Sequence, residues 1–260
     1  MKFYFSLFCE LLGVLIFFNV SFTQQTFWQS MNGPFSGEIE ALVIDKHGNI
    51  FAGTNGGGVF KSTTHGDVWV LTGLRDVKVE EMIARPAGDL FVATQNRGIF
   101  RSVDQGDMWF PVNSGLTNLH VSALTFGQDG VLFAGTNGSG VFKSTDDGNS
   151  WSPINHGLTD LHIQALFVDS KNNLFAGTPT GIFKSSDNGE NWIQVFSGGQ
   201  PFRQFAANSK GYIFVAGSGV RVSIDDGMTW QEINKGLEVT NIFSLWVNDR
   251  DDIFVGTYLK

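Results

Sequence analysis

The sequence contains a single cysteine, Cys9, among its 260 residues. No intramolecular disulfide can therefore form, and the hydrophobic core must stabilise the fold without one. Basic residues are also few, because 17 Lys and Arg stand against 25 Asp and Glu, giving a net charge of -8 with no basic cluster. This acidic balance argues against a nucleic-acid-binding protein, which needs a positively charged surface.

A hydrophobic segment near the N-terminus predicts export. The apolar run Leu11–Phe18 is followed by Ser21 and Thr23, small residues at positions suited to a cleavage site. This order is typical of a signal peptide, so we predict a signal peptide over residues 1–23 and a secreted, extracellular or periplasmic domain over residues 24–260. An uncleaved membrane anchor is the alternative, because the apolar stretch approaches the ~20 residues that span a bilayer. After cleavage we expect no stable membrane insertion.

Aromatic residues make up 13% of the sequence and 32 residues are glycine. Both kinds occur in a repeat. One apolar five-residue segment is found at Ile50–Thr54, Leu90–Thr94, Leu132–Thr136, Leu174–Thr178, Ile213–Gly217 and Ile253–Thr257. A segment of the type Gly-Val-Phe-Lys-Ser follows the first five copies, and a tryptophan comes after each. Successive tryptophans from Trp28 to Trp230 are 41, 40, 42, 41 and 38 residues apart. A period near 40 with short apolar segments predicts the four-stranded blade of a β-propeller.

Each repeat unit divides into four short strands. In the third unit they are predicted at about Ala123–Phe126, Val131–Thr136, Gly140–Ser144 and Trp151–Asn155. Gly, Asn and Asp separate these segments and accept the backbone angles of tight hairpins. No helical periodicity persists through residues 24–260, which excludes a helical solenoid. We therefore predict an all-β fold, a β-propeller of about six four-stranded blades.

The two ends of the repeat predict how the last blade is built. The segment from Trp28 to Gly33 matches the outer-strand segment that begins at Trp151. We therefore predict that this N-terminal outer strand pairs into the same blade as Ile253–Thr257 and closes the ring. That last blade is incomplete, because it has no third strand. A fragment of a longer protein and an atypical closing blade both explain this pattern.

The turn before each tryptophan has the pattern Ser-x-Asp-x-Gly-x-x-Trp. Its four full copies are Ser102, Asp104, Gly106 and Trp109; Ser144, Asp146, Gly148 and Trp151; Ser185, Asp187, Gly189 and Trp192; and Ser223, Asp225, Gly227 and Trp230. A further copy has Thr64 in place of Asp. The pattern resembles the Asp-box, or BNR, repeat of sialidase-like propellers and of photosystem II assembly-factor-like secreted proteins, over about residues 24–260.

We interpret these turns as structural. The Ser and Asp oxygens can accept backbone N–H bonds inside the turn, Gly adopts the angles that other residues resist, and Trp covers the hairpin. A repeated metal-binding or acidic role is the alternative, but a catalytic acid is needed once and not in every blade. The resemblance implies that the turns lie on the face opposite the usual binding site.

Polar residues near the start of each inner strand are the candidate ligand-binding site, at one mouth of the central channel. They are Glu38, Glu40, Lys78, Glu80, His120, His162, Arg203 and Asn241. They differ between blades, unlike the repeated core positions, as binding residues of repeat proteins do. Arg203 favours an anionic group such as a carboxylate. The alternatives are solvated strand ends, or a metal site built on the two histidines, but no third ligand has a defined spacing. We expect no metal and no cofactor.

Tyrosine is scarce, which bears on catalysis. The resemblance implies that a sialidase-like enzyme uses an arginine triad, a tyrosine nucleophile with a glutamate, and an aspartate acid. Tyr4, Tyr212 and Tyr258 are the only tyrosines and none is expected at the mouth. We therefore predict no catalytic residues, and a secreted binding or scaffold module for a protein or carbohydrate. The alternative is a glycoside hydrolase, either sialidase-like or, with paired carboxylates from the cluster of Glu38, Glu40, Glu80 and Glu81, xyloglucanase-like.

Overall fold

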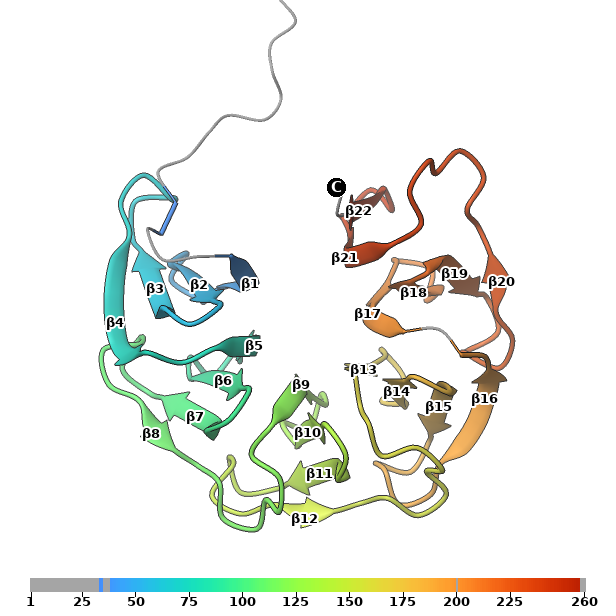
Figure 1. Ribbon diagram of the computed structural model, residues 1–260, viewed down its shortest axis with the longest axis horizontal. Helices are drawn as coiled ribbons and strands as arrows, with labels where there is room; N and C mark the ends of the chain where they lie inside the picture. Colours follow the sequence, from blue (N-terminus) through green and yellow to red (C-terminus); the bar gives the residue numbers. More distant parts are fainter. Residues whose placement is uncertain (1–32, 35–37, 200, 258–260) are drawn as a thin grey trace, which may run out of the picture. The chain divides into compact units, whose positions relative to one another are not determined.

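The computed structural model describes residues 33–34, 38–199 and 201–257. Within these ranges the chain forms only strands, turns and loops, with no helix, and therefore no helix that could cross a bilayer. The strands form six antiparallel sheets, five with four strands and one with two (Figure 1). The predicted all-β fold is confirmed. The predicted signal peptide and the predicted N-terminal outer strand lie outside the described residues.

Each four-stranded blade is a meander whose strands follow chain order from the inner to the outer edge. The first three blades contain β1 (Ile39–Ile44), β2 (Ile50–Thr54), β3 (Gly58–Ser62) and β4 (Val70–Arg75); β5 (Val79–Ala84), β6 (Leu90–Thr94), β7 (Gly98–Ser102) and β8 (Phe110–Pro111); and β9 (Val121–Phe126), β10 (Leu132–Thr136), β11 (Gly140–Ser144) and β12 (Ser152–Pro153). The next two contain β13 (Ala165–Val168), β14 (Leu174–Thr178), β15 (Gly181–Ser185) and β16 (Ile193–Ser197); and β17 (Phe202–Ala207), β18 (Ile213–Gly217), β19 (Gly219–Ser223) and β20 (Gln231–Glu232). Blade 6 contains β21 (Ile242–Val247) and β22 (Ile253–Thr257).

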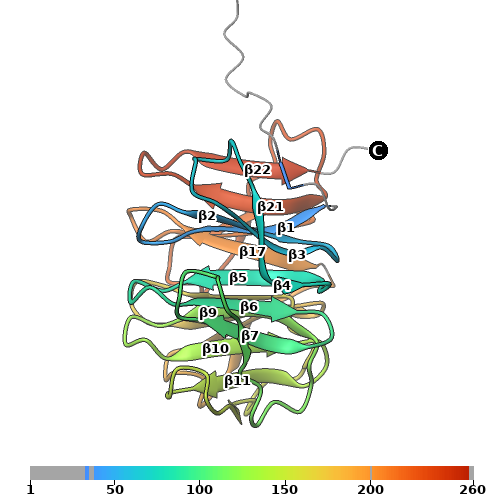
Figure 2. The same cartoon turned by 90° about the vertical axis from the view of Figure 1, so that its left-hand side faces the viewer.

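Consecutive blades pack through their inner strands, so β1 contacts β5, β5 contacts β9, and the series continues to β17 and β21 (Figure 1, Figure 2). The phenylalanine of the repeated apolar segment extends each core toward the next blade. The Phe51 ring lies 2.7 Å from the position that a Cβ would occupy at Gly106, and the Phe91 ring lies 3.1 Å from that of Gly148. The turn glycine therefore leaves room for the neighbouring blade, besides having a positive φ.

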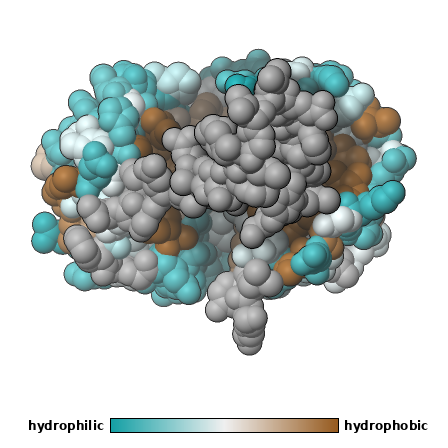
Figure 3. Space-filling view, turned by 90° about the horizontal axis from the view of Figure 1, so that it is seen from above, coloured by the Kyte–Doolittle hydropathy of each residue, from teal (hydrophilic) through white to brown (hydrophobic). Residues whose placement is uncertain are grey.

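The two end blades expose apolar residues that are buried in the other blades. Leu42 of blade 1 is 63% exposed, whereas Met82 at the same position of blade 2 is 2% exposed. Phe254 of blade 6 is 40% exposed, whereas its equivalent Phe51 is fully buried. Figure 3 shows such apolar surface beside the grey residues. Among the described residues, these two faces have no neighbouring blade to cover them, whereas the faces between blades are covered.

Candidate binding site

The inner strands of five blades share one irregularity. In β1, β5, β9, β17 and β21 the pairing with the next strand slips by one residue, and the extra residues are Glu40, Glu80, Ser122, Arg203 and Phe243. Such a β-bulge leaves one residue outside the ladder and redirects its side chain. Three of the predicted site residues, Glu40, Glu80 and Arg203, are therefore bulge residues.

The bulges were not predicted, although the spacing of apolar residues in the sequence carries a signal for them. Val79 and Met82 are both buried although they are three residues apart, and Val121 and Leu124 repeat this spacing. In a regular strand, residues an odd number apart face opposite sides of the sheet. Apolar residues at a spacing of three inside a strand therefore indicate an inserted residue between them.

The starts of the inner strands lie beside the hairpins that join second and third strands. The backbone N–H of Asn55 donates to the Glu38 carbonyl at 2.9 Å, and the Asn137 N–H donates to the His120 carbonyl at 3.0 Å. The same hairpins pair with the next blade, in the bridges Asn55–Lys78, Asn137–His162 and Ser218–Asn241. The structure therefore places Glu38, Lys78, His120, His162 and Asn241 along one face.

Side chains of blades 2 and 3 form a linked acidic group on this face. The Glu80 carboxylate lies 3.3 Å from Lys78 Nζ and 3.8 Å from His120 Nε2. Burial raises the pKa of Glu40, Lys78 opposes that effect, and the nearby carboxylates of Glu80 and Glu38 add to it. Negative charge is therefore in excess around Lys78.

Glu81, which follows the bulge in β5, is a further titratable residue of this region. Burial raises its pKa from 4.5 to about 7, against the effect of the hydrogen bond from the Met82 N–H. Blades 1 and 3 have Ala41 and Ala123 at the same place in the register. A carboxyl group with such a pKa exchanges its proton near neutral pH.

The remaining predicted residues have partners of their own. The Arg203 guanidinium lies 4.2 Å from the centroid of the Phe243 ring, a cation–π contact between neighbouring blades. His162 Nδ1 lies 3.1 Å from Asp160 Oδ1. Burial acts to raise the pKa of Asp160, but hydrogen bonds from His162 and Thr180 outweigh it and the pKa is lowered. Across the described ranges no group of three or more His, Cys, Asp and Glu side chains is arranged to hold a metal ion.

The Ser-x-Asp-x-Gly-x-x-Trp turns use their polar groups internally. In blade 3 the Gly148 N–H donates to Ser144 Oγ at 2.9 Å, and the Ser150 N–H donates to Asp146 Oδ1 at 2.8 Å. In blade 1, Thr64 Oγ1 replaces the carboxylate and accepts the Val68 N–H at 2.9 Å. The structure thus shows the hydrogen bonds expected of a capped turn.

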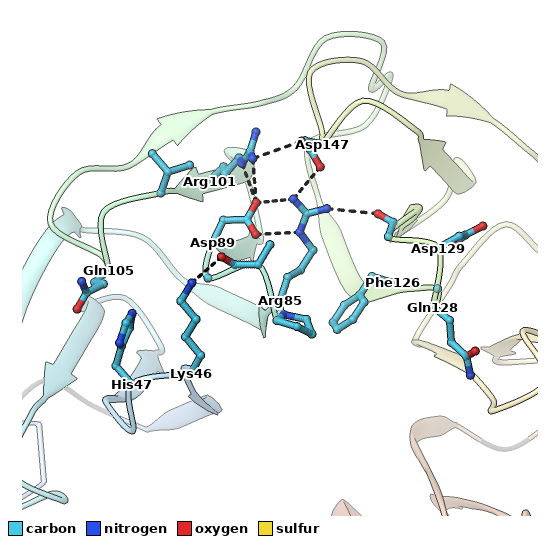
Figure 4. A pocket seen from close by; sticks show the side chains of 16 residues that line it. Lys46, His47, Arg85, Asp89, Arg101, Gln105, Phe126, Gln128, Asp129 and Asp147 are labelled. Atoms are coloured by element: carbon cyan, nitrogen blue, oxygen red, sulfur yellow. Dashed lines mark hydrogen bonds and ion pairs between the residues drawn. The ribbon is translucent and has the colours of Figure 1, made fainter.

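A pocket of about 810 Å³ lies among the turns and hairpins of blades 1 to 3 (Figure 4), and none of the predicted binding residues lines it. At its wall, Arg85 Nε donates to Asp89 Oδ1 at 2.9 Å, and Arg85 Nη2 lies 2.7 Å from Asp147 Oδ1. Arg101 Nη2 lies 2.9 Å from Asp89 Oδ2, and both guanidinium groups stack over Phe91. Since the charges compensate one another, this cluster joins blade 2 to the turn of blade 3.

No family model matches the sequence, and no curated protein matches it. Among solved structures, the chain is similar to the extracellular domain of a putative one-component system from B. thetaiotaomicron, with a TM-score of 0.72 and 17% identity over 85% of this chain and 31% of that one. An ancestral GH74 enzyme gives a TM-score of 0.72 and 21% identity over 88% of this chain and 36% of that one. YCF48 bound to D1 peptide gives a TM-score of 0.63 and 18% identity over 84% of this chain and 75% of that one. The chain spans about a third of the length of the first two, and it has the β-propeller fold.

Proposed function

We propose that this protein is a non-catalytic, secreted binding or scaffold module that recognises a protein or a carbohydrate with the side chains at the starts of its inner strands. The observation that carries the proposal is the repeated bulge. The bulge redirects side chains of different chemistry, among them Glu40, Glu80 and Arg203. The core positions of the blades that carry these side chains are nearly identical to one another. Variable side chains on a constant framework are how repeat proteins build binding surfaces.

The two faces differ in what they offer a ligand. On the Ser-x-Asp-x-Gly-x-x-Trp turns, carboxylates such as Asp146 and Asp187 already accept hydrogen bonds from their own turns. On the inner-strand face, Arg203 and Glu40 are exposed. The structure of YCF48 bound to D1 peptide concerns a protein of similar fold, and it supports a polypeptide ligand here.

A glycoside hydrolase is the second candidate, favoured by one observation. The pKa of Glu81 is raised to about 7, and Glu80 and Glu40 carry further carboxylates in the same region. A protonated acid near an ionised carboxylate is the pair that glycosidic bond cleavage requires. The similarity in fold to an ancestral GH74 enzyme agrees with this alternative.

Peptide and glycan arrays probed with the full chain test the first proposal. For the best array hit, Arg203→Ala and His162→Ala should each weaken binding about fivefold or more, because each removes an exposed donor worth about 1–3 kcal/mol. Glu190→Gln, on an exposed residue beside the turn of blade 4, is the matched control and should leave Kd unchanged. Loss of binding in the control with full binding in the other two variants would place the ligand on the opposite face.

Assays of the same protein against xyloglucan and sialylated substrates test the alternative. If the parent protein hydrolyses one of these substrates, and Glu81→Gln abolishes the activity while the fold stays intact, the protein is a hydrolase and the binding-module proposal is wrong. Absence of turnover, together with array binding that depends on Arg203, supports the binding module.

A further inference from the structure

The hairpin between the first and second strands of a blade opens with a capping side chain in four of the six described blades. In blade 1, Asp45 Oδ1 accepts the backbone N–H of Asn49 at 2.9 Å. The residues that accept the equivalent bond in blades 4, 5 and 6 are Asp169, Asn208 and Asn248. Blades 2 and 3 have Arg85 and Gly127 at this position. Two adjacent blades therefore depart from the repeat at the same place, and such departures in an otherwise consistent sequence are expected at functional sites.

The pocket of about 810 Å³ is lined by these two hairpins and by the corresponding hairpin of blade 1. Its volume is in the range of small-molecule sites, about 300–1,000 Å³. Each complete blade is an antiparallel meander, so its first hairpin and the turn before its outer strand lie at one end, and its second hairpin lies at the other. Lys46 and Asp129 line the pocket from first hairpins, and Gln105 and Asp147 line it from turns. The pocket is therefore at the end of the blades opposite to the candidate binding residues, which lie beside second hairpins.

The charged side chains of the pocket compensate one another. Its three cations and three carboxylates are Lys46, Arg85 and Arg101, and Asp89, Asp129 and Asp147. Asp89 is buried and pairs with both guanidinium groups, whereas the Asp147 side chain is 53% exposed. Because neither sign is in excess, the pocket has no net attraction for an ion and suits an uncharged ligand.

The polar groups that remain open in the pocket suit hydroxyl groups. Arg85 Nη1 donates one long hydrogen bond, of 3.3 Å, to the Gly130 carbonyl. The exposed Asp147 carboxylate offers acceptor oxygens nearby, one of them 2.7 Å from Arg85 Nη2. A hydroxyl group donates one hydrogen bond and accepts others, so it can bind a guanidinium and a carboxylate together. Hydrogen bonds to such charged groups are stronger than those between neutral groups.

Apolar surface lies among these polar groups. Val103 is 65% exposed at the pocket, and Phe126 is half-buried there. Figure 4 shows Lys46 and His47 on one side of Arg85, and Phe126 on the other. A lining of apolar patches with donors and acceptors around them matches a sugar ring, which carries C–H groups on its faces and hydroxyl groups at its edge.

We propose that this pocket is a second ligand site and that it binds a neutral oligosaccharide. Arg85, which replaces a capping residue, supplies the donor, and Asp147 supplies the acceptor. An extended peptide fits less well, because hairpins and turns have no free strand edge to which it could add. The inference does not depend on the proposed function, since the pocket and the candidate binding site share no residue.

Titration calorimetry of the full chain with cellohexaose, xylohexaose, mannohexaose and a xyloglucan oligosaccharide tests the proposal, with an oligogalacturonate as the anionic comparison. At least one neutral oligosaccharide should bind. Its Kd should not change as the salt concentration is raised, because an uncharged ligand has no interaction for salt to screen. Val103→Asp should weaken this binding about tenfold or more, since it replaces an apolar contact by a charge that the sugar does not neutralise.

Ile224→Asp is the matched control. Ile224 has the same place in the turn of blade 5 and is 63% exposed, but it does not line the pocket, so this variant should keep the parental Kd. His47→Ala and Lys210→Ala form a second pair, at one position of the first hairpin in blades 1 and 5. His47→Ala should weaken binding about threefold or more, because it removes a hydrogen-bonding side chain from the pocket, and Lys210→Ala should leave Kd unchanged.

Four outcomes overturn the proposal. The first is no binding of any neutral oligosaccharide, and the second is tighter binding of the oligogalacturonate. The third is oligosaccharide binding that Arg203→Ala abolishes and Val103→Asp leaves unchanged, which places the sugar at the inner strands and supports the proposed function alone. The fourth is a peptide whose binding is lost in Val103→Asp and kept in Ile224→Asp, which makes a polypeptide the ligand of the pocket.

Discussion

The side-chain oxygen of Asn155 accepts a 2.7 Å hydrogen bond from the backbone N–H of Val141. Its amide nitrogen donates to the Ser139 carbonyl at 3.0 Å. The side-chain oxygens of Asn113 and Asn234 accept the equivalent hydrogen bonds, from the backbone N–H groups of Ile99 and Val220. The asparagine at the end of each of these outer strands therefore ties that strand to the start of the third strand and, in blades 2 and 3, to the adjoining hairpin.

Asn155→Ala should lower the free energy of unfolding by about 1–3 kcal/mol, because the Val141 N–H and the Ser139 carbonyl lose their partner. Denaturant unfolding of the parent and the variant measures the difference. Ser152→Ala, at an exposed position of β12, is the control and should stay within about 0.5 kcal/mol of the parent. Equal losses in both variants would contradict a specific role for Asn155.

Acid should weaken the turns. Hydrogen bonds from Asn191 lower the pKa of Asp187 to about 2, and those from Thr229 do the same for Asp225. A carboxyl whose pKa is lowered by folding contributes stability above its unfolded pKa of about 3.9, and loses it as pH falls. Stability should therefore fall between about pH 4 and pH 2.

The variant carrying both Asp187→Asn and Asp225→Asn should show a shallower fall over this pH range than the parent. Chemical unfolding at a series of pH values measures the two slopes. Asp249→Asn, at an exposed position, is the control and should keep the parental slope. Parallel curves for all three proteins would show that the turn carboxylates do not govern the acid response.

The third repeat unit shows how far the sequence predicts the fold. The predicted strand Gly140–Ser144 is β11, and the predicted Val131–Thr136 exceeds β10 by one residue. The predicted outer strand Trp151–Asn155 is wrong in extent, since β12 covers only Ser152–Pro153. Trp151 instead packs in the core, Pro153 has no N–H to extend the ladder, and Asn155 uses its side chain.

Contacts between residues that are far apart in the chain could not be predicted from the sequence. Arg85 and Asp147 are 62 residues apart, and Arg85 Nη2 donates to the carboxylate at 2.7 Å. Arg85 takes the place of a turn residue that is Asp45 in blade 1 and Asp169 in blade 4. No local sequence pattern predicts such a pairing. The repeat predicts the strands and turns that all blades share, and not the residues by which one blade differs from the others.

Asp89→Ala should be among the most damaging substitutions in blade 2. It removes the carboxylate that pairs with both Arg85 and Arg101, and it leaves the more exposed Asp147 as the carboxylate that both guanidinium groups share. Removing one partner of a buried ion pair costs about 3–5 kcal/mol. Thermal and denaturant unfolding measure the loss, and Lys46→Ala, an exposed residue of the same pocket, should change stability by less than about 1 kcal/mol.

Glu81 gives a pH dependence of opposite sign to that of the turns. Its pKa is raised by burial from 4.5 to about 7, so the folded protein binds this proton more tightly than the unfolded chain does. Stability from this group is therefore greatest at low pH, declines as pH rises from about 4.5 to 7, and is constant above that range.

Glu81→Gln keeps the shape of the side chain and removes the charge. The variant should lose the decline between about pH 4.5 and 7, and at pH 8 it should be more stable than the parent by about 3 kcal/mol, the free energy that corresponds to this pKa shift. Glu238→Gln, on an exposed residue, is the control and should follow the parent at every pH. If the stability of Glu81→Gln falls with pH in parallel with the parent, Glu81 is ionised at little cost in the folded protein. Its environment is then open to water and not the desolvated one that the raised pKa describes.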